Sequence, residues 1–176
     1  MGYRISTLKN LPPDLGCYYF LVGDYRNSSM VNDLFRDGFR IIADRLGENN
    51  AIIESTDRGL EKYNWELATA LSRNIHQRTK SDELSSIILY FESRIPGLLI
   101  MWRHPSRLSI EDSFIHIPFQ VLENVYTNST ELLTDLVSYA KGENINLITR
   151  IKSQHRFIKG FSVSLNMGIF AFNIDL

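Results

Sequence analysis

Residues 17–22 form an unbroken run of strand-forming residues, Cys-Tyr-Tyr-Phe-Leu-Val, which ends at Gly23. A short apolar run that stops at a glycine is typical of a strand buried within a sheet. Such a strand cannot stand alone. The rest of the chain therefore has to supply further strands and the helices that cover them.

A helix is predicted over residues 30–46, soon after this strand. Ser28 or Ser29 can cap its start, and Gly47 ends it. Gly38 lies inside, where glycine costs about 1 kcal/mol relative to alanine, so we expect a close neighbour at that face. The apolar stripe of this helix consists of Val31, Leu34, Phe35, Ile41, Ile42 and Leu46.

The spacing of apolar and capping residues predicts two further helices. A strand over residues 51–54 leads to a helix over about 59–75, and its apolar residues recur at helical intervals. The last helix begins after Asn128, because Glu131 follows at the spacing of a capping box. Lys141 and Gly142 close it, as the helix dipole and the usual C-cap favour.

The remaining segments are predicted as strands. Residues 3–8 form an edge strand, 87–92 and 98–103 an antiparallel pair, and 113–119 a further strand. Three more strands, over residues 146–152, 156–165 and 169–175, would make a C-terminal β-meander, with 166–168 as a hairpin loop.

These elements predict a single α+β (mixed α/β) domain over residues 1–176, with about three helices packed on a largely antiparallel sheet. At 176 residues the chain should bury about 70% of its unfolded surface. Hydrophobic residues make up 44% of the chain and charged residues 22%, which excludes a disordered chain.

The net charge of -1 argues against a general polyanion binder, so nucleic acid is not the expected partner. The single cysteine, Cys17, is typical of a reducing compartment. The N-terminal residues include no apolar leader, and the apolar runs are too short to span a membrane. We therefore expect a cytoplasmic protein without a membrane contact.

The first candidate site is the loop from Gly23 to Ser29, between the buried strand and the first helix. Arg26, Ser28 and Ser29 can donate to a phosphate or another small anion there. Asp24 would lie at the carboxyl end of the strand, where acid/base groups are often placed. The alternative is an ordinary loop whose serines cap the helix.

The second candidate is a set of carboxylates, Glu54, Asp57, Glu61 and Glu66. Glu66 follows Trp65, and a neighbouring aromatic ring can raise the pKa of a carboxyl. This stretch resembles the glutamate-bearing helix of TIR-type NAD-cleaving domains, which read W-C-x-x-E. Here Trp65 and Glu66 are adjacent, so we assign no family. The alternative is a set of solvated helix carboxylates.

The third candidate is a basic patch that can bind phosphate, RNA or an acidic protein surface. On a strand, Arg150 and Lys152 would point to the same side. The alternative is a solvent face or a protected sheet edge. The patch consists of Arg150, Lys152, His155, Arg156 and Lys159.

The fourth candidate is the segment 102–112, where His104 lies close in sequence to arginines and carboxylates. No histidine or cysteine spacing matches a metal site, and no cofactor motif is present, so neither is expected. His116, flanked by Ile115 and Ile117, is expected to be a structural histidine.

The sequence favours a protein-interaction or ligand-binding domain without catalysis. The aromatic residues Tyr18, Tyr19, Tyr25, Tyr90, Trp102 and Tyr126 would anchor an interface, and the alternating C-terminal strands suit a homodimer. One alternative is a small enzyme acting on a nucleotide or phosphorylated ligand, with Asp24, Glu66 or His104 as catalytic groups. The other is a nucleic-acid accessory protein that uses the basic patch.

Overall fold

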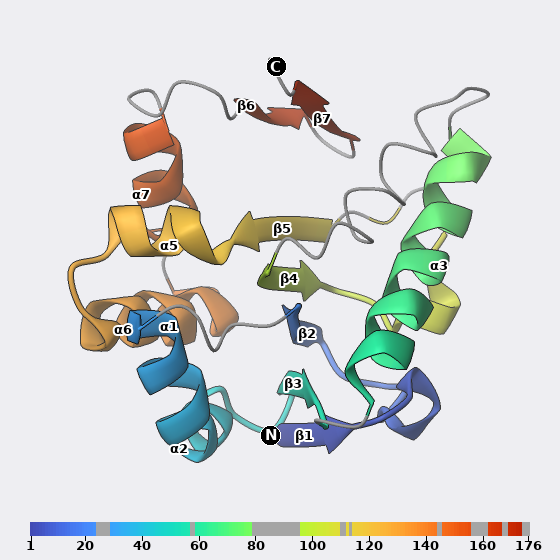
Figure 1. The fold of residues 1–176 in the computed structure, drawn as a ribbon, viewed down its shortest axis with the longest axis horizontal. Helices are drawn as coiled ribbons and strands as arrows, with labels where there is room; N and C mark the ends of the chain where they lie inside the picture. Colours follow the sequence, from blue (N-terminus) through green and yellow to red (C-terminus); the bar gives the residue numbers. More distant parts are fainter. Residues whose placement is uncertain are drawn as a thin grey trace.

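A five-stranded sheet lies at the centre of the computed structural model (Figure 1), with the strands in the order β1-β3-β2-β4-β5. The structure describes residues 1–23, 29–56, 59–78, 96–109, 112, 114–143, 146–155, 162–166 and 169–173. The strands are β1 (Gly2–Ile5), β2 (Cys17–Val22), β3 (Asn50–Ser55), β4 (Gly97–Met101) and β5 (Phe114–Pro118).

The sheet combines parallel and antiparallel pairs. β1 and β2 both run parallel to β3, whereas β4 runs antiparallel to β2 and β5 antiparallel to β4. The mixed α/β class is confirmed, but the five-stranded sheet is mixed rather than largely antiparallel. β2 has a neighbour on each side and every one of its residues is buried, so the predicted buried strand is confirmed.

One face of the sheet is covered by most of the helices (Figure 1). Their apolar residues pack with Tyr19 and Leu21 of β2 and with Ile100 of β4. The helical elements on this face are α1 (Ser29–Asn32), the π-helical turn η2 (Asp33–Asp37), α2 (Phe39–Arg45), α5 (Phe119–Val125), α6 (Ser129–Ala140) and α7 (Asn146–His155).

The opposite face is covered by α3 (Leu60–Arg78), which Figure 1 shows on the other side of the strands. Tyr63, Leu67 and Leu71 of α3 are fully buried and belong to one apolar cluster with Tyr18 and Phe20 of β2. This stripe is the one that the helical spacing predicted. A short 3-10 turn, η1 (Leu8–Asn10), contributes Leu8 to the same cluster.

The helix predicted over residues 30–46 is interrupted. A π-helical turn separates α1 from α2, and Gly38 lies at the junction. A Cβ on Gly38 would overlap the carbonyl oxygen of Leu34, so the close neighbour expected there is the backbone itself. The described residues contain six α-helices rather than about three. The predicted cap of α6 is confirmed, because Asn128 Oδ1 accepts from the Glu131 N–H at 3.0 Å.

The predicted C-terminal meander is wrong in its first strand. Residues 146–155 form helix α7, because Leu147 and Ile151 are four residues apart and both enter the core. Leu147 and Ile151 would also lie on the same side of a strand, because side chains alternate along it, which explains the error. β6 (Ser162–Asn166) and β7 (Ile169–Asn173) form a separate antiparallel pair, with Leu165 opposite Phe170.

The predicted strand over residues 87–92 lies outside the described part of the chain. The strand predicted over 98–103 appears as β4, which pairs with β2 on one side and with β5 on the other. The predicted strands at 51–54 and 113–119 are confirmed as β3 and β5. No helix in the described segments is long and apolar enough to cross a membrane.

Candidate functional site

The carboxyl ends of the parallel strands meet at one edge of the sheet. β1, β3 and β2 end there at Ile5, Ser55 and Val22. The chain continues from β2 to α1 and α2 on one face, and from β3 to α3 on the opposite face. The connections of two neighbouring parallel strands therefore diverge at this edge. Ligands of open α/β sheets commonly bind at such places.

Gly23 joins the two diverging connections. Its backbone has φ 77°, a left-handed conformation that favours glycine, and a Cβ there would lie 2.8 Å from Pro96 Cα. Its N–H donates to Oδ1 of Asn64 in α3 at 3.3 Å. No described residue accepts from Asn64 Nδ2. The Asn64 amide at the end of β2 thus has Nδ2 donors that no described residue uses.

The turn after β3 is closely packed against the end of β1. The Thr56 N–H donates to the Ile5 carbonyl at 2.9 Å, and the Gly59 N–H donates to the Thr56 carbonyl at 2.8 Å. A Cβ on Gly59 would lie 2.6 Å from Ser6 Cα. This contact fixes the start of α3 relative to the strand ends.

Glu54 is a buried carboxylate near the same edge, with 5% of its surface exposed. Arg4 of β1 forms an ion pair with it and places its guanidinium carbon 5.3 Å from the ring centroid of Phe39. A buried charge is tolerated only when it is paired. Glu54 therefore has a structural partner within the sheet.

The loop residues predicted to bind an anion follow Gly23 directly along the chain. Asp24, Arg26 and Ser28 lie outside the described residues. Ser29 is the first residue of α1, and the structure does not describe its side chain. Their roles stay predictions. Gly23, the residue before Asp24, does lie at the edge where the connections diverge.

Glu66 of α3 accepts hydrogen bonds from residues at the start of η1. Its oxygens accept from the Thr7 hydroxyl at 2.9 Å and from the Leu8 N–H at 2.6 Å. These contacts hold the start of η1 against α3 and satisfy a donor at a helix end. Glu66 is thus engaged in joining two elements, and it is only partly exposed.

His104 is buried and lies at the N-cap of a short 3-10 turn, η3 (Pro105–Arg107). Its Nδ1 accepts from the Ser106 N–H at 3.2 Å and lies 2.7 Å from the Ser106 hydroxyl. Burial lowers the pKa of His104, Arg107 lowers it further, and Asp14 opposes the shift. The ring also contacts Tyr18 edge-on, with centroids 5.8 Å apart.

The structure separates His104 from Gly23, which lie at opposite ends of β2. Gly97 of β4 is opposite Val22, whereas Met101 at the other end of β4 is opposite Tyr18. His104 follows Met101 and contacts Tyr18, so it lies at the amino end of β2. Gly23 lies at the carboxyl end. His104 and Gly23 therefore lie at opposite ends of β2, and Asp24 itself lies outside the described residues.

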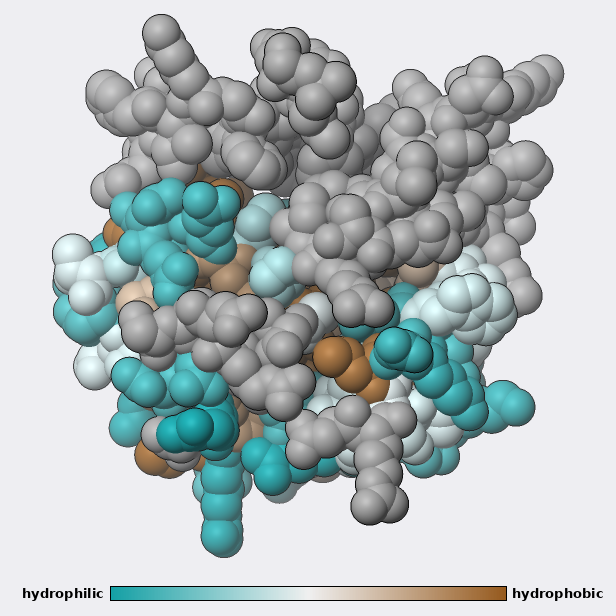
Figure 2. Space-filling model, in the orientation of Figure 1, coloured by the Kyte–Doolittle hydropathy of each residue, from teal (hydrophilic) through white to brown (hydrophobic). Residues whose placement is uncertain are grey.

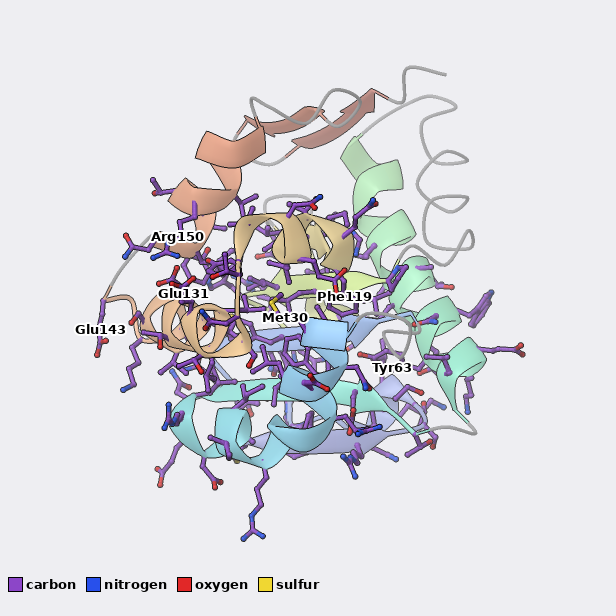
Figure 3. The ribbon with its side chains drawn as sticks, turned by 60° about the vertical axis from the view of Figure 1, so that its left-hand side comes forward. Met30, Tyr63, Phe119, Glu131, Glu143 and Arg150 are labelled. Carbon is purple, nitrogen blue, oxygen red and sulfur yellow. The ribbon has the colours of Figure 1, made fainter. Side chains whose placement is uncertain are left out.

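The basic patch loses its predicted strand geometry, because Arg150 and Lys152 lie on helix α7. Arg150 Nε lies 3.2 Å from Asp135 Oδ2, and a terminal nitrogen lies 3.6 Å from Glu131 Oε2. Figure 3 shows Arg150 and Glu131 on facing elements. The structure does not describe the side chains of Lys152 and His155, or any part of Arg156 and Lys159. The basic patch therefore stays a prediction.

Sequence reasoning missed the polar cluster around Asp135, which is 7% exposed. The Tyr126 hydroxyl donates to Asp135 Oδ2 at 3.0 Å, and the Arg150 guanidinium carbon lies 5.6 Å from the Tyr126 ring centroid. Burial, followed by the bond to Asp135, raises the pKa of Tyr126. The helical spacing of Glu131 and Asp135 was the available signal, but α7 was assigned as a strand.

Cys17 is buried, and burial raises the pKa of its thiol to about 11, so it is poorly suited to act as a nucleophile. His116 is buried in β5, as expected of a structural histidine, and burial lowers its pKa to about 3. Within the described ranges, no group of three or more His, Cys, Asp or Glu side chains is placed to hold a metal ion.

Comparisons with protein families, curated proteins and solved structures find no match for this chain.

Proposed function

We propose that this chain is a ligand-binding domain that takes a nucleotide or another small phosphorylated molecule at the carboxyl edge of β2 and β3. The observation that carries the proposal is the divergence of the connections, toward α1 from β2 and toward α3 from β3. Ligands of open α/β sheets commonly bind where such connections separate.

The chemistry of the residues at this edge supports an anionic ligand. Asn64 offers Nδ2 donors, and its oxygen is held by Gly23. Arg26 and Ser28, which follow Gly23 within a few residues, can supply a guanidinium and a hydroxyl. The nearby Glu54 carboxylate is paired with Arg4, so its charge is compensated.

We propose that the domain binds its ligand without catalysing a reaction. Glu66 already accepts from Thr7 and Leu8, and His104 lies at the other end of β2. An acid/base mechanism needs such groups to converge on one substrate. The enzyme alternative therefore has less support than binding alone.

The test is a thermal-shift series with ADP, NAD and inorganic phosphate. A ligand that binds only the folded chain at 100 times its dissociation constant adds about 2.7 kcal/mol of stability. Arg26→Ala should reduce the shift. Arg40→Ala, on an exposed position of α2, is the matched control and should retain it. The absence of a shift with every probe would contradict the proposal.

A second candidate is self-association through α3, because Trp65 is 64% exposed (Figure 3 shows α3 with side chains at the surface). Large exposed aromatics are frequent anchors of interfaces. The aromatic anchors expected from the sequence are less suitable. Tyr18, Tyr19 and Tyr126 are buried, Tyr25 and Tyr90 lie outside the described residues, and Trp102 is 41% exposed.

Light scattering tests this candidate. It predicts a mass above 20.3 kDa at micromolar concentration, which returns to the monomer value in Trp65→Ala. Trp102→Ala is the control, because Trp102 already contacts Tyr139 with ring centroids 6.5 Å apart. A monomer mass for the wild-type chain would remove the candidate.

A further inference from the structure

Ser106, in the short turn η3, has an exposed hydroxyl beside an imidazole nitrogen. The hydroxyl oxygen lies 2.7 Å from Nδ1 of His104, and the Ser106 backbone N–H donates to the same nitrogen at 3.2 Å. Because Nδ1 accepts from the backbone, it carries no proton, and the ring proton is on Nε2. The Ser106 hydroxyl therefore donates its proton to Nδ1, and no described residue donates to its oxygen.

The imidazole of His104 is held in place and in its neutral form. Its ring lies edge-on against Tyr18, and the Tyr18 hydroxyl donates to the Pro12 carbonyl at 2.7 Å, which fixes that ring in turn. Burial lowers the pKa of His104, Arg107 lowers it further, and Asp14 opposes the shift. A neutral, oriented imidazole that accepts from a hydroxyl is the arrangement of a nucleophile with its general base.

Ser109, three residues further along the chain, has a different partner. Its hydroxyl donates to Oδ2 of Asp112 at 2.8 Å. Burial alone would raise the pKa of Asp112, but the hydrogen bonds from Ser109 and the Arg103 guanidinium outweigh burial and lower it. A carboxylate with a lowered pKa is a weak base. Ser109 therefore has the same hydroxyl in the same segment without a comparable base beside it.

We propose that Ser106 is a covalent modification site, which takes the acyl group of an activated ester or thioester with His104 as its general base. The Ser106 oxygen attacks the carbonyl carbon and forms a new C–O bond, while its proton moves to Nδ1 of His104. The bond from that carbon to the leaving oxygen or sulfur breaks, and its electron pair leaves with that atom. His104 then passes the proton to the leaving group, so the products are O-acyl-Ser106 and a free alcohol or thiol.

The geometry restricts the acyl donor to one with a good leaving group. When Nδ1 takes the proton, the Ser106 N–H loses its acceptor, and the lowered pKa of His104 makes it a weak base. A phenolate or a thiolate leaves without being protonated first, whereas the alkoxide of an ordinary ester does not. The proposal covers this single transfer to each chain. It is independent of the ligand site at the carboxyl edge, because His104 lies at the other end of β2.

The experiment treats the full chain with p-nitrophenyl acetate and locates the acetyl groups by peptide mapping with mass spectrometry. We expect Ser106 to be acetylated at equal rates in the wild type and in the control Ser109→Ala. His104→Asn keeps an oxygen that can accept from the Ser106 N–H but removes the base. It should slow the acetylation of Ser106 about 100-fold. An unmodified Ser106 in the wild type, or an equal rate in His104→Asn, would overturn the inference.

The pH dependence of the wild-type chain is a second readout, which needs no variant. The neutral form of His104 increases as the pH rises through its pKa, which burial and then Arg107 hold below the ordinary 6.5 against the opposing charge of Asp14. The rate of Ser106 acetylation should therefore have its midpoint below pH 6.5. Ser109 in the same peptide map is the internal control and should stay unmodified. A midpoint above pH 6.5, or as much acetyl on Ser109 as on Ser106, would overturn the inference.

Discussion

The backbone N–H of Gly23 donates to Oδ1 of Asn64 at 3.3 Å, which joins the end of β2 to the second turn of α3. Between the two residues the chain passes through α1, α2 and β3, and they lie on connections that leave toward opposite faces of the sheet. Figure 2 shows both hydrophilic and hydrophobic residues on the described part of one molecular face. The Gly23–Asn64 contact joins the two connections at this edge, and no described residue accepts from Asn64 Nδ2.

Substitution of Asn64 separates the structural role of this contact from ligand binding. Asn64→Asp keeps an oxygen that can accept from Gly23 but removes the Nδ2 donors and adds a negative charge. We expect it to unfold within about 0.5 kcal/mol of the wild type and to lose at least tenfold in affinity for ADP. Lys62→Ala, exposed on the same helix, is the control. Equal ADP affinity in Asn64→Asp and the wild type would show that Asn64 does not contact the ligand.

Arg150 is predicted to hold α7 on α6. Arg150→Ala would leave the buried Asp135 carboxylate without its cation, so we expect a loss of about 1–2 kcal/mol in urea unfolding. The value is modest because Arg150 is 44% exposed and solvent screens the pair. Arg45→Ala, on an exposed position of α2, should change stability little. Equal stability of Arg150→Ala and the wild type would contradict this role.

We expect the stability of the fold to require glycine at position 97, because the His116 ring packs closely against it. A Cβ on Gly97 would overlap the His116 ring and would lie 2.8 Å from the Ile117 carbonyl oxygen. We expect Gly97→Ala to destabilise the fold by about 1–3 kcal/mol, measured by chemical denaturation. Gly47→Ala is the comparison, because nothing lies within 4 Å of its added Cβ and only its positive φ opposes the change. A smaller loss for Gly97→Ala than for Gly47→Ala would contradict the packing argument.

We expect the stability of the fold to depend on pH because of the buried His116. Burial lowers its pKa to about 3 in the folded chain, whereas the ordinary pKa of a histidine is 6.5. Between these values the unfolded chain binds the proton and the folded chain does not, so stability falls as the pH drops from 6.5 toward 3. At pH 5 this proton uptake lowers the free energy of unfolding by about 2 kcal/mol relative to pH 7.5. Urea unfolding at pH 7.5 and 5 measures it, and His116→Leu should weaken the dependence. An unchanged dependence in that variant would show that other groups cause it.

Most of the sheet followed from the sequence because its strands have local signals. The apolar run of β2 ends at Gly23, and α6 begins at the Asn128 cap, so both were predictable from neighbouring residues. The order of the strands was not predictable, because it depends on which strands pair across long stretches of chain. β1, for example, pairs with β3 rather than with β2.

The errors came from patterns that fit two structures. Leu147 and Ile151 are compatible with one face of a helix or one side of a strand, and their burial in the core decided for the helix. The candidate loop after β2 was located from Gly23 alone. Asn64 was missed, because only the fold brings it to Gly23.

The most direct test of the account is an amide chemical-shift map of the 20.3 kDa chain during titration with ADP. We expect the largest changes at Gly23, Thr56 and Asn64. Amides of α6, such as those of Leu132 and Leu136, should stay in place. Changes confined to α6 and α7, or no change at any ADP concentration up to several millimolar, would contradict a ligand site at the carboxyl edge of β2 and β3.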